Sequence, residues 1–237
     1  IKKLKIPTRM AYLISIGSTV CGTTAIMATA PVIGAKKNEV SYAIANITLF
    51  GILSMFLYPY FANFYFDNEP LLVGLFLGTS IHETSQVAAA GLIYDQQFNS
   101  PETLNIATVT KLIRNTFLII MIPLFAFLYN RGRAVEKKYS IIYIFPYFVL
   151  GFVAMIVIRN FGDLIFSNSF EWLVVVDYIK LSSKIFLTMA MAAIGLSTNL
   201  KEIRNMGFKP FVVGFIGMAT VGVVCIMTIE LYLKYFN

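Results

Sequence analysis

One apolar segment of the chain carries most of the side chains that could do chemistry. His82 is the only histidine in the sequence, Glu83 follows it directly, and Gln86 stands one helical turn later. Ionisable groups at membrane depth are costly, so they usually face a protein interior or a watery cavity. Because histidine titrates near neutrality, this arrangement predicts a pair that handles protons or ions. The alternative is a hydrogen-bonded polar clamp between helices.

His82 and Glu83 also match the first two residues of the zinc-protease motif His-Glu-x-x-His. Gln86 stands where the second histidine belongs, and no other histidine exists in the sequence. A catalytic zinc needs about three protein ligands. The sequence also lacks a phosphate-binding loop, a dinucleotide fingerprint and a nucleophile elbow. We therefore expect no enzyme, no bound metal and no cofactor.

A second segment resembles this one in residue class. Residues 17–26 match residues 78–87 at most positions, at a constant offset of 61. Both are rich in glycine and hydroxyl side chains. Two such segments at corresponding places predict interrupted membrane helices, whose free N–H groups meet an anion or whose carbonyls meet a cation. Simple packing of small residues is the alternative. The candidate binding residues here are Ser18, Thr19, Cys21, Thr23 and Ser80.

Basic side chains inside apolar segments are candidate anion ligands. Lys111 and Arg114 are three residues apart and share a helical face. Their alternative is to snorkel toward the headgroups. We expect Lys111 to snorkel and Arg114, one turn deeper, to contact an anion. Lys184 is a third candidate, whereas Asp177 and Lys180 on the same face are expected to pair outside the apolar core.

The composition excludes a soluble domain. Hydrophobic residues make up 58% of the chain and charged residues 13%, whereas soluble domains carry about a quarter of charged residues. The net charge of +7 comes from basic residues in short loops, which is typical of cytoplasmic membrane faces rather than of nucleic-acid binding. Both cysteines lie in apolar segments, so we expect no disulfide.

Seven apolar segments are long enough to cross a bilayer, at about 20 residues each. We predict an all-α polytopic membrane helix bundle with broken helices, a single domain over residues 1–237. The predicted spans are residues 11–34, 40–61, 71–93, 104–129, 140–158, 172–196 and 210–234. Since the chain begins at Ile1 rather than at methionine, we expect that further residues precede it.

Basic residues set the expected orientation. They cluster before the first span, after the fourth and after the sixth, which lie on one side of a seven-span bundle. The other side would hold Lys36, Lys37, Arg159 and Lys234, and the acidic loop 62–70 would lie with the basic clusters. Because basic loops stay inside, Ile1 is expected in the cytoplasm and Asn237 outside.

The chain resembles the YeiH-type bacterial membrane proteins, a family also named for sulfate export, over nearly all of its length. The resemblance rests on residues 17–22, on the His82, Glu83 and Gln86 element, on residues 111–114 and on the small-residue run 189–196. Val20 and Thr23 depart mildly from the family's first motif. Family members carry further spans before this point, so about the first third of such a protein would be absent here.

The resemblance extends distantly to bile-acid and sodium/proton transporters, which have five-span inverted repeats with crossed, broken helices. By that likeness, the first and sixth spans would form the crossing pair. The 61-residue repeat does not fit this pattern easily, because copies two spans apart run in the same direction rather than inverted. The sequence leaves open whether the repeat is parallel or involves a re-entrant segment.

These observations favour a secondary transporter in a bacterial plasma (inner) membrane. Its expected cargo is a small anion, sulfate or a sulfonate-derived anion by the resemblance, moved down its own gradient or coupled to a proton or a sodium ion. One alternative is a cation/proton antiporter centred on His82 and Glu83. Another is a membrane receptor or scaffold without transport. The expected partners are the lipid bilayer and no nucleic acid, with a homo-oligomer left open.

Overall fold

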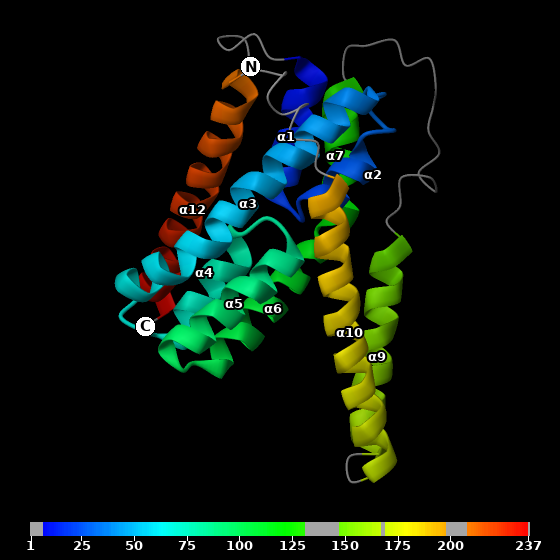
Figure 1. Cartoon of the computed structure of the whole chain (residues 1–237), viewed down its shortest axis with the longest axis vertical. Helices are drawn as coiled ribbons and strands as arrows, with labels where there is room; N and C mark the ends of the chain where they lie inside the picture. The colour runs from blue at the N-terminus through cyan, green and yellow to red at the C-terminus, as the bar shows by residue number, and fades with distance from the viewer. Residues whose placement is uncertain (1–6, 131–146, 167–168, 198–207, 237) are drawn as a thin grey trace. The chain divides into compact units, whose positions relative to one another are not determined.

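The computed structural model describes residues 7–130, 147–166, 169–197 and 208–236 (Figure 1). Every regular element in these ranges is an α-helix, as predicted. The chain divides into two compact units. The first unit comprises Ile1–Ile144 with Asn199–Asn237, and the second comprises Phe145–Thr198.

The segment predicted as the first span is a pair of short helices that turns back on itself. Helix α1 covers Thr8–Thr19 and helix α2 covers Thr23–Thr29. Between them Gly22 has a φ of 67°, a left-handed conformation that glycine adopts without steric cost. A Cβ added at Gly17 would lie 2.9 Å from the Ile26 side chain, although a straight helix would separate these residues by about 13 Å. We refer to α1 and α2 as the first hairpin.

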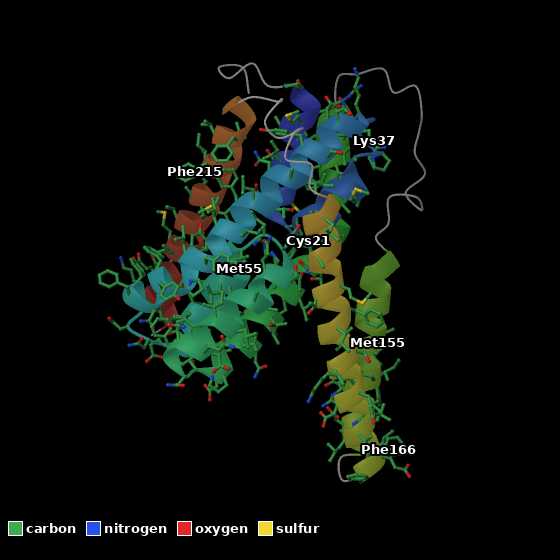
Figure 2. The ribbon with its side chains drawn as sticks, viewed as in Figure 1. Cys21, Lys37, Met55, Met155, Phe166 and Phe215 are labelled. Carbon is green, nitrogen blue, oxygen red and sulfur yellow. The ribbon has the colours of Figure 1, made fainter. Side chains whose placement is uncertain are left out.

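Helix α3 (Lys37–Tyr65) then crosses the first unit. Its 29 residues extend about 43 Å, enough for a bilayer core. The Lys36 N–H donates to the Glu39 carboxylate at 2.7 Å and closes the first turn. Figure 2 places Cys21 midway along this unit and Lys37 toward the end where α1 begins, so the first hairpin does not cross.

The segment predicted as the third span is also two helices, α4 (Pro70–Ser80) and α5 (Thr84–Phe98). Both pack on α6 (Pro101–Thr116). Figure 1 shows α1, α2 and the start of α3 toward one end of the first unit, and α4, α5 and α6 toward the other.

Helices α4 and α5 run in opposite directions along α6. Near the start of α6, Leu104 lies against Gly91, and near its end the Asn115 amide donates to the Thr84 hydroxyl at 3.1 Å. Helix α5 is therefore antiparallel to α6.

Helix α4 runs parallel to α6. Gly74 lies against Ile106, and one turn later Gly78 lies against Thr110. Because α4 and α5 follow α6 in opposite senses, they form a second hairpin, which begins and ends at the same end of α6.

Helix α7 (Leu118–Asn130) continues α6 toward the end where α1 begins. There the Arg9 guanidinium donates to the Tyr129 hydroxyl at 3.1 Å, and the Tyr12 ring packs edge-on against Phe125. Helix α1 is thus antiparallel to α6 and α7, whereas α4 is parallel to α6. The two hairpins enter from opposite ends, so the 61-residue repeat is inverted. Of the two possibilities that the sequence left open, the structure has the re-entrant one, because the first hairpin turns back and α3 alone separates the copies.

Helix α12 (Phe208–Phe236) runs beside α3 in the same direction. Gly214 packs against Phe50, the Met218 carbonyl accepts from the Tyr58 hydroxyl at 3.2 Å, and further on Tyr65 donates to Glu230. Among the described residues, Lys37–Tyr65 and Phe211–Tyr235 are the segments long and apolar enough to cross a membrane.

The hairpins change the predicted distribution of charge. Lys36 and Lys37 lie at the end of the first unit where α1 begins, rather than across from it. The acidic loop with Asp67 and Glu69 lies at the other end, where α3 finishes and α4 starts. The physical reason is the left-handed turn at Gly22, which returns the chain to its starting side.

The second unit contains α9 (Tyr147–Phe166) and α10 (Phe170–Ser197). Trp172 packs against Gly162 and donates to Asp163 at 2.8 Å. On the exposed face of α10, Lys180 pairs with Asp177 at 3.4 Å. Lys184 is also in α10, but the structure does not describe its side chain. The loop 131–138 likewise lies outside the described residues.

Candidate functional site

The turns of the two hairpins meet within the first unit. We define the first tip as residues 20–22 and the second tip as residues 81–83. A Cβ added at Gly22 would lie 2.6 Å from the Cγ of Glu83. Gly22 and Glu83 occupy equivalent positions in the 61-residue repeat. The inverted copies therefore touch at matching residues.

The second tip has an extended backbone. Ile81 and Glu83 have ψ values of 139° and 143°. Successive side chains of an extended chain point to opposite faces. The side chains of His82 and Glu83 consequently point to opposite faces of the second tip, which we call the His82 face and the Glu83 face. They form no hydrogen bond with each other, and whether they handle protons or ions stays a prediction.

Lys111 joins the two tips. Its Nζ donates to the carbonyls of Val20 at 3.0 Å and Ile81 at 2.6 Å, which are again equivalent residues of the repeat. Helix C-termini leave carbonyls without partners and carry a partial negative charge. Lys111 neutralises the ends of α1 and α4 together. Its side chain is fully buried, so the snorkelling interpretation is wrong.

Arg114 makes a similar set of contacts one turn further along α6. Its Nε and Nη2 donate to the carbonyls of Thr19 at 3.1 Å and Ser18 at 2.9 Å. Its Nη1 donates to the carbonyl of Thr79, the counterpart of Ser18 in the repeat. The guanidinium therefore caps both helix ends, and its contact with an anion stays a prediction.

The His82 face is positively charged and lacks hydrogen bonds. The imidazole is fully buried, and neither ring nitrogen has a partner among the described residues. Lys111 and Arg114 both lie within electrostatic reach of the ring. Ser18 is buried near the end of α1, and its unpartnered hydroxyl lies against Gly217 of α12. His82 and the two cations together suit a negatively charged group.

The Glu83 face gathers oxygen atoms. Glu83 is 3% exposed and its carboxylate makes no close hydrogen bond, although the backbone N–H of Thr23 lies near it. The hydroxyls of Thr23 and Thr48 are its polar neighbours. The Gln86 amide donates to the Thr48 carbonyl at 3.3 Å, while its Oε1 packs onto Gly51 without a donor. These acceptors come from α2, α3, the second tip and α5.

Some predicted ligands have partners of their own. The Ser80 hydroxyl donates to the Phe76 carbonyl at 2.6 Å, and the Thr19 hydroxyl donates to the Ser15 carbonyl at 3.0 Å. Such back-bonding is the usual local partner of a helical hydroxyl. Cys21 is buried in the first tip. Thr48 and Gly51 were not predicted, because no motif distinguishes them within an apolar span.

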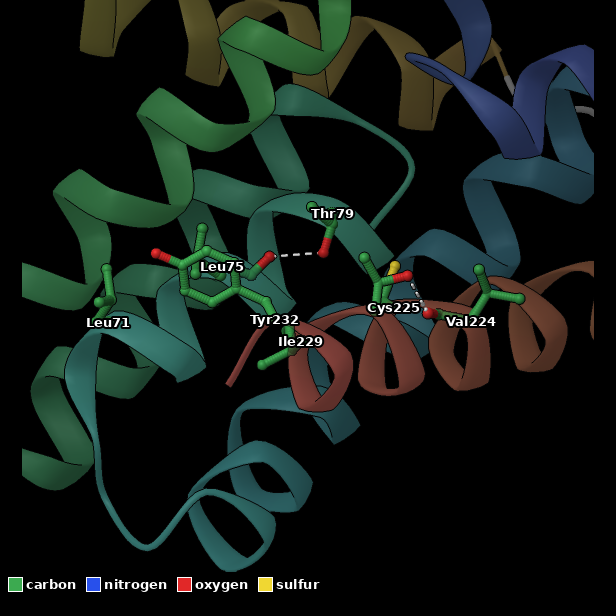
Figure 3. Close-up of a pocket in the computed structure, with 8 residues that line it drawn as sticks. Leu71, Leu75, Thr79, Val224, Cys225, Ile229 and Tyr232 are labelled. Carbon is green, nitrogen blue, oxygen red and sulfur yellow. Dashed lines mark hydrogen bonds between the residues drawn. The ribbon is translucent and has the colours of Figure 1, made fainter. Parts of the chain in front are cut away.

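A separate apolar cavity lies between α4 and α12 (Figure 3). Its volume is about 520 Å³. At its polar side the Thr79 hydroxyl donates to the Leu75 carbonyl at 2.6 Å. The lining residues are Leu71, Leu75, Thr79, Val224, Cys225, Thr228, Ile229 and Tyr232. No polar pattern in the sequence indicates this cavity.

Comparison with known proteins identifies relatives of this chain. A family model described as Conserved hypothetical protein 698 matches residues 1–225. A UPF0324 membrane protein of Fusobacterium nucleatum is 37% identical over 224 residues, which cover 90% of this chain and 64% of that protein. One of Streptococcus agalactiae is 36% identical over 213 residues, covering 90% and 62%. One of Clostridium tetani is 32% identical over 229 residues, covering 91% and 63%.

The chain thus spans just under two thirds of the length of these curated relatives. No solved structure matches it. The family model covers nearly the whole chain, and the relatives are membrane proteins by name. This chain therefore belongs to the Conserved hypothetical protein 698 family, the YeiH-type or UPF0324 membrane proteins.

Proposed function

We propose that this protein is a secondary transporter of a small anion, with its binding site at the two hairpin tips. The observation that carries the proposal is the meeting of inverted hairpins around buried polar groups. Inverted repeats with discontinuous helices at mid-membrane are a recurring construction of secondary transporters. Half-helix ends then face the substrate, and each repeat can open toward its own side.

Unsatisfied polar groups argue for transport over a scaffold. The hydroxyls of Ser18 and Thr48, both ring nitrogens of His82 and the Gln86 Oε1 make no close hydrogen bond within the described residues. Each such group costs about 1 to 3 kcal/mol in a dry interior. A scaffold gains nothing from this cost, whereas a transporter satisfies the groups when its substrate enters.

Charge supports an anion on the His82 face. Lys111 and Arg114 bring two positive charges to the tips, and Glu83 is the one buried acid among the described residues. The C-termini of α1 and α4 and the N-termini of α2 and α5 meet here, so their partial charges of about half a unit cancel. The tips keep a surplus positive charge that a small anion would neutralise. Sulfate is the family-suggested substrate.

The orientation follows from the ends of the first unit. Arg9, Lys36 and Lys37 share the end where α1 begins. The basic loop sequences 131–138 and 201–207 attach to helix ends at that same side, after Asn130 and before Phe208. By the positive-inside rule we place this end in the cytoplasm of a bacterial inner membrane. Ile1 is then inside and Asn237 outside.

A cation/proton antiporter is the second candidate. It is favoured by one observation, namely that both cations already donate to helix carbonyls and offer an anion few donors. In that case protons and cations would exchange at Glu83, and the His82 face would bind no anion.

Counterflow in liposomes tests these functions. Purified protein is reconstituted in liposomes loaded with sulfate, and uptake of radiolabelled sulfate is measured. We expect exchange above that of protein-free liposomes, and a decrease of about tenfold or more in His82→Leu, which removes the imidazole N–H that an anion on the His82 face would accept from. Gln97→Ala, at an exposed position on α5, is the matched control.

The antiporter predicts a different pattern. Sulfate exchange would be at background, while an imposed pH gradient would drive Na⁺ or K⁺ flux that Glu83→Gln abolishes. If no ion moves above the protein-free background, transport itself is refuted.

A further inference from the structure

We propose that the Glu83 face binds a sodium ion. The inference rests on the proposed function and deepens it, because this ion would be the coupling ion for the anion on the His82 face. The site consists of the Glu83 carboxylate, the Thr48 hydroxyl and the Gln86 Oε1, with the Thr23 hydroxyl beside them.

The donor set selects the kind of ion. All of these groups offer oxygen, and hard cations prefer oxygen ligands. A transition metal would need nitrogen or sulfur ligands, yet no three His, Cys, Asp or Glu side chains gather in the described part of the chain. A divalent ion would be poorly neutralised by the single carboxylate. A monovalent cation matches one negative charge with several neutral oxygens.

A proton on Glu83 would bind at one oxygen only. It would leave the Gln86 Oε1 dependent on a threonine hydroxyl as donor, whereas a sodium ion contacts several oxygens at once. The amide is held in place, because its nitrogen donates to the Thr48 carbonyl. A Cβ added at Gly51 would lie 2.0 Å from this Oε1. Gly51 therefore leaves room for an acceptor that has no protein partner.

The position of the site couples the binding of the sodium ion to the binding of the anion. Gly22 of the first tip covers Glu83, so an ion bound there contacts the place where the two hairpins meet. His82 is the neighbouring residue and faces the other way. An ion that fixes the extended second tip would fix the orientation of His82 at the same time. Binding on one face then favours binding on the other, as reciprocal linkage requires.

Lys111 is close to Glu83 but does not occupy its place. Its ammonium is turned toward the Val20 and Ile81 carbonyls. The carboxylate therefore makes no direct ion pair with Lys111, although the two charges interact at longer range.

Thermal unfolding of the purified protein tests the site with Na⁺ as the probe. NaCl is exchanged for choline chloride at constant ionic strength and pH. We expect NaCl to raise Tm by about 5 °C or more at about 100-fold over Kd. Thr48→Val should need roughly tenfold more Na⁺ for the same shift, the scale on which groups around a metal alter its affinity. Glu83→Gln should lose the response.

The control variant is Ser54→Ala. Its hydroxyl is on the same helix as Thr48 but donates to the Phe50 carbonyl at 2.9 Å, so its Na⁺ response should equal that of the unmodified protein. If Glu83→Gln does not fold, Thr48→Val against Ser54→Ala decides the question. A Tm that ignores Na⁺, or that follows pH and not Na⁺, overturns the proposal.

Sulfate counterflow separates this inference from the proposed function. Sulfate exchange that proceeds equally without Na⁺, together with a Tm insensitive to Na⁺, overturns the sodium site and leaves the transporter standing. A Na⁺-dependent Tm without any sulfate exchange supports the site and contradicts the anion transporter.

Discussion

Lys111→Met should destabilise the first unit by removing the link between the two tips. Methionine keeps the length of the lysine stem and most of its volume, so little cavity forms. The change removes the donor to the carbonyls of Val20 and Ile81, at 3.0 and 2.6 Å. Both carbonyls are then left at buried helix ends without a partner.

The size of the effect follows from these two bonds. Each buried acceptor left without a donor costs about 1 to 3 kcal/mol, or about 2 to 6 kcal/mol for both. Removing a buried charge returns part of this cost, because the ammonium no longer has to be desolvated. We expect a net loss of about 2 to 4 kcal/mol. On the scale of soluble domains of similar length, this lowers Tm by about 4 to 16 °C.

Dye-based thermal unfolding in detergent measures this shift. A thiol-reactive dye suits the protein, because Cys21 is buried and Cys225 half-buried until the helices separate. Lys37→Met is the matched control, since Lys37 is exposed at the start of α3. Removing a positive charge from a helix N-terminus should leave Tm unchanged or slightly raised.

One result would refute this reasoning. If Lys111→Met unfolds within about 2 °C of the unmodified protein while Lys37→Met behaves as expected, the carbonyls of the tips do not depend on Lys111. The tips would then be held by packing alone.

Two further predictions concern packing and topology. Gly78→Ala should lower Tm strongly, because the added Cβ would lie 2.5 Å from a backbone carbonyl of α6. The control Gly151→Ala should leave Tm unchanged, because nothing lies within 4 Å of its added Cβ. Equal Tm values for the two variants would contradict the close contact of α4 and α6. With the native cysteines replaced, cysteines at Thr8 and Lys36 should be labelled from the cytoplasmic side and one at Asn68 only from outside. Labelling of Lys36 from the side opposite Thr8 would show that the first hairpin crosses the membrane.

Composition and glycine spacing predicted much of the fold. The low content of charge and the long apolar runs required membrane helices. The clusters around Gly22 and His82 predicted the interruptions, and both lie where the structure breaks the helices. The return of each hairpin was not predictable, because an apolar run of 23 or 24 residues fits a single span and a re-entrant pair equally well.

The site was predicted in its residues more than in its contacts. His82, Glu83, Gln86, Lys111 and Arg114 do gather at the tips. Their partners depended on backbone geometry that residue types do not reveal. Lys111 could be recognised as a double cap only once the carbonyls of Val20 and Ile81 were known to lie together. The opposite faces of His82 and Glu83 likewise follow from the extended backbone.

The contact between Gly22 and Glu83 has a consequence for how the two halves of the repeat can diverge. Equivalent residues of an inverted duplication face each other across its pseudo-twofold axis, and at this point the space holds one side chain, since even a Cβ at Gly22 would lie 2.6 Å from Glu83. A glutamate in both copies would bring two carboxylates into one position, which neither volume nor like-charge repulsion permits. The two copies must therefore carry different residues at the position that lies on the axis. The first copy has a glycine at this position and the second has a glutamate, so the two copies differ chemically at their point of contact although they share one fold.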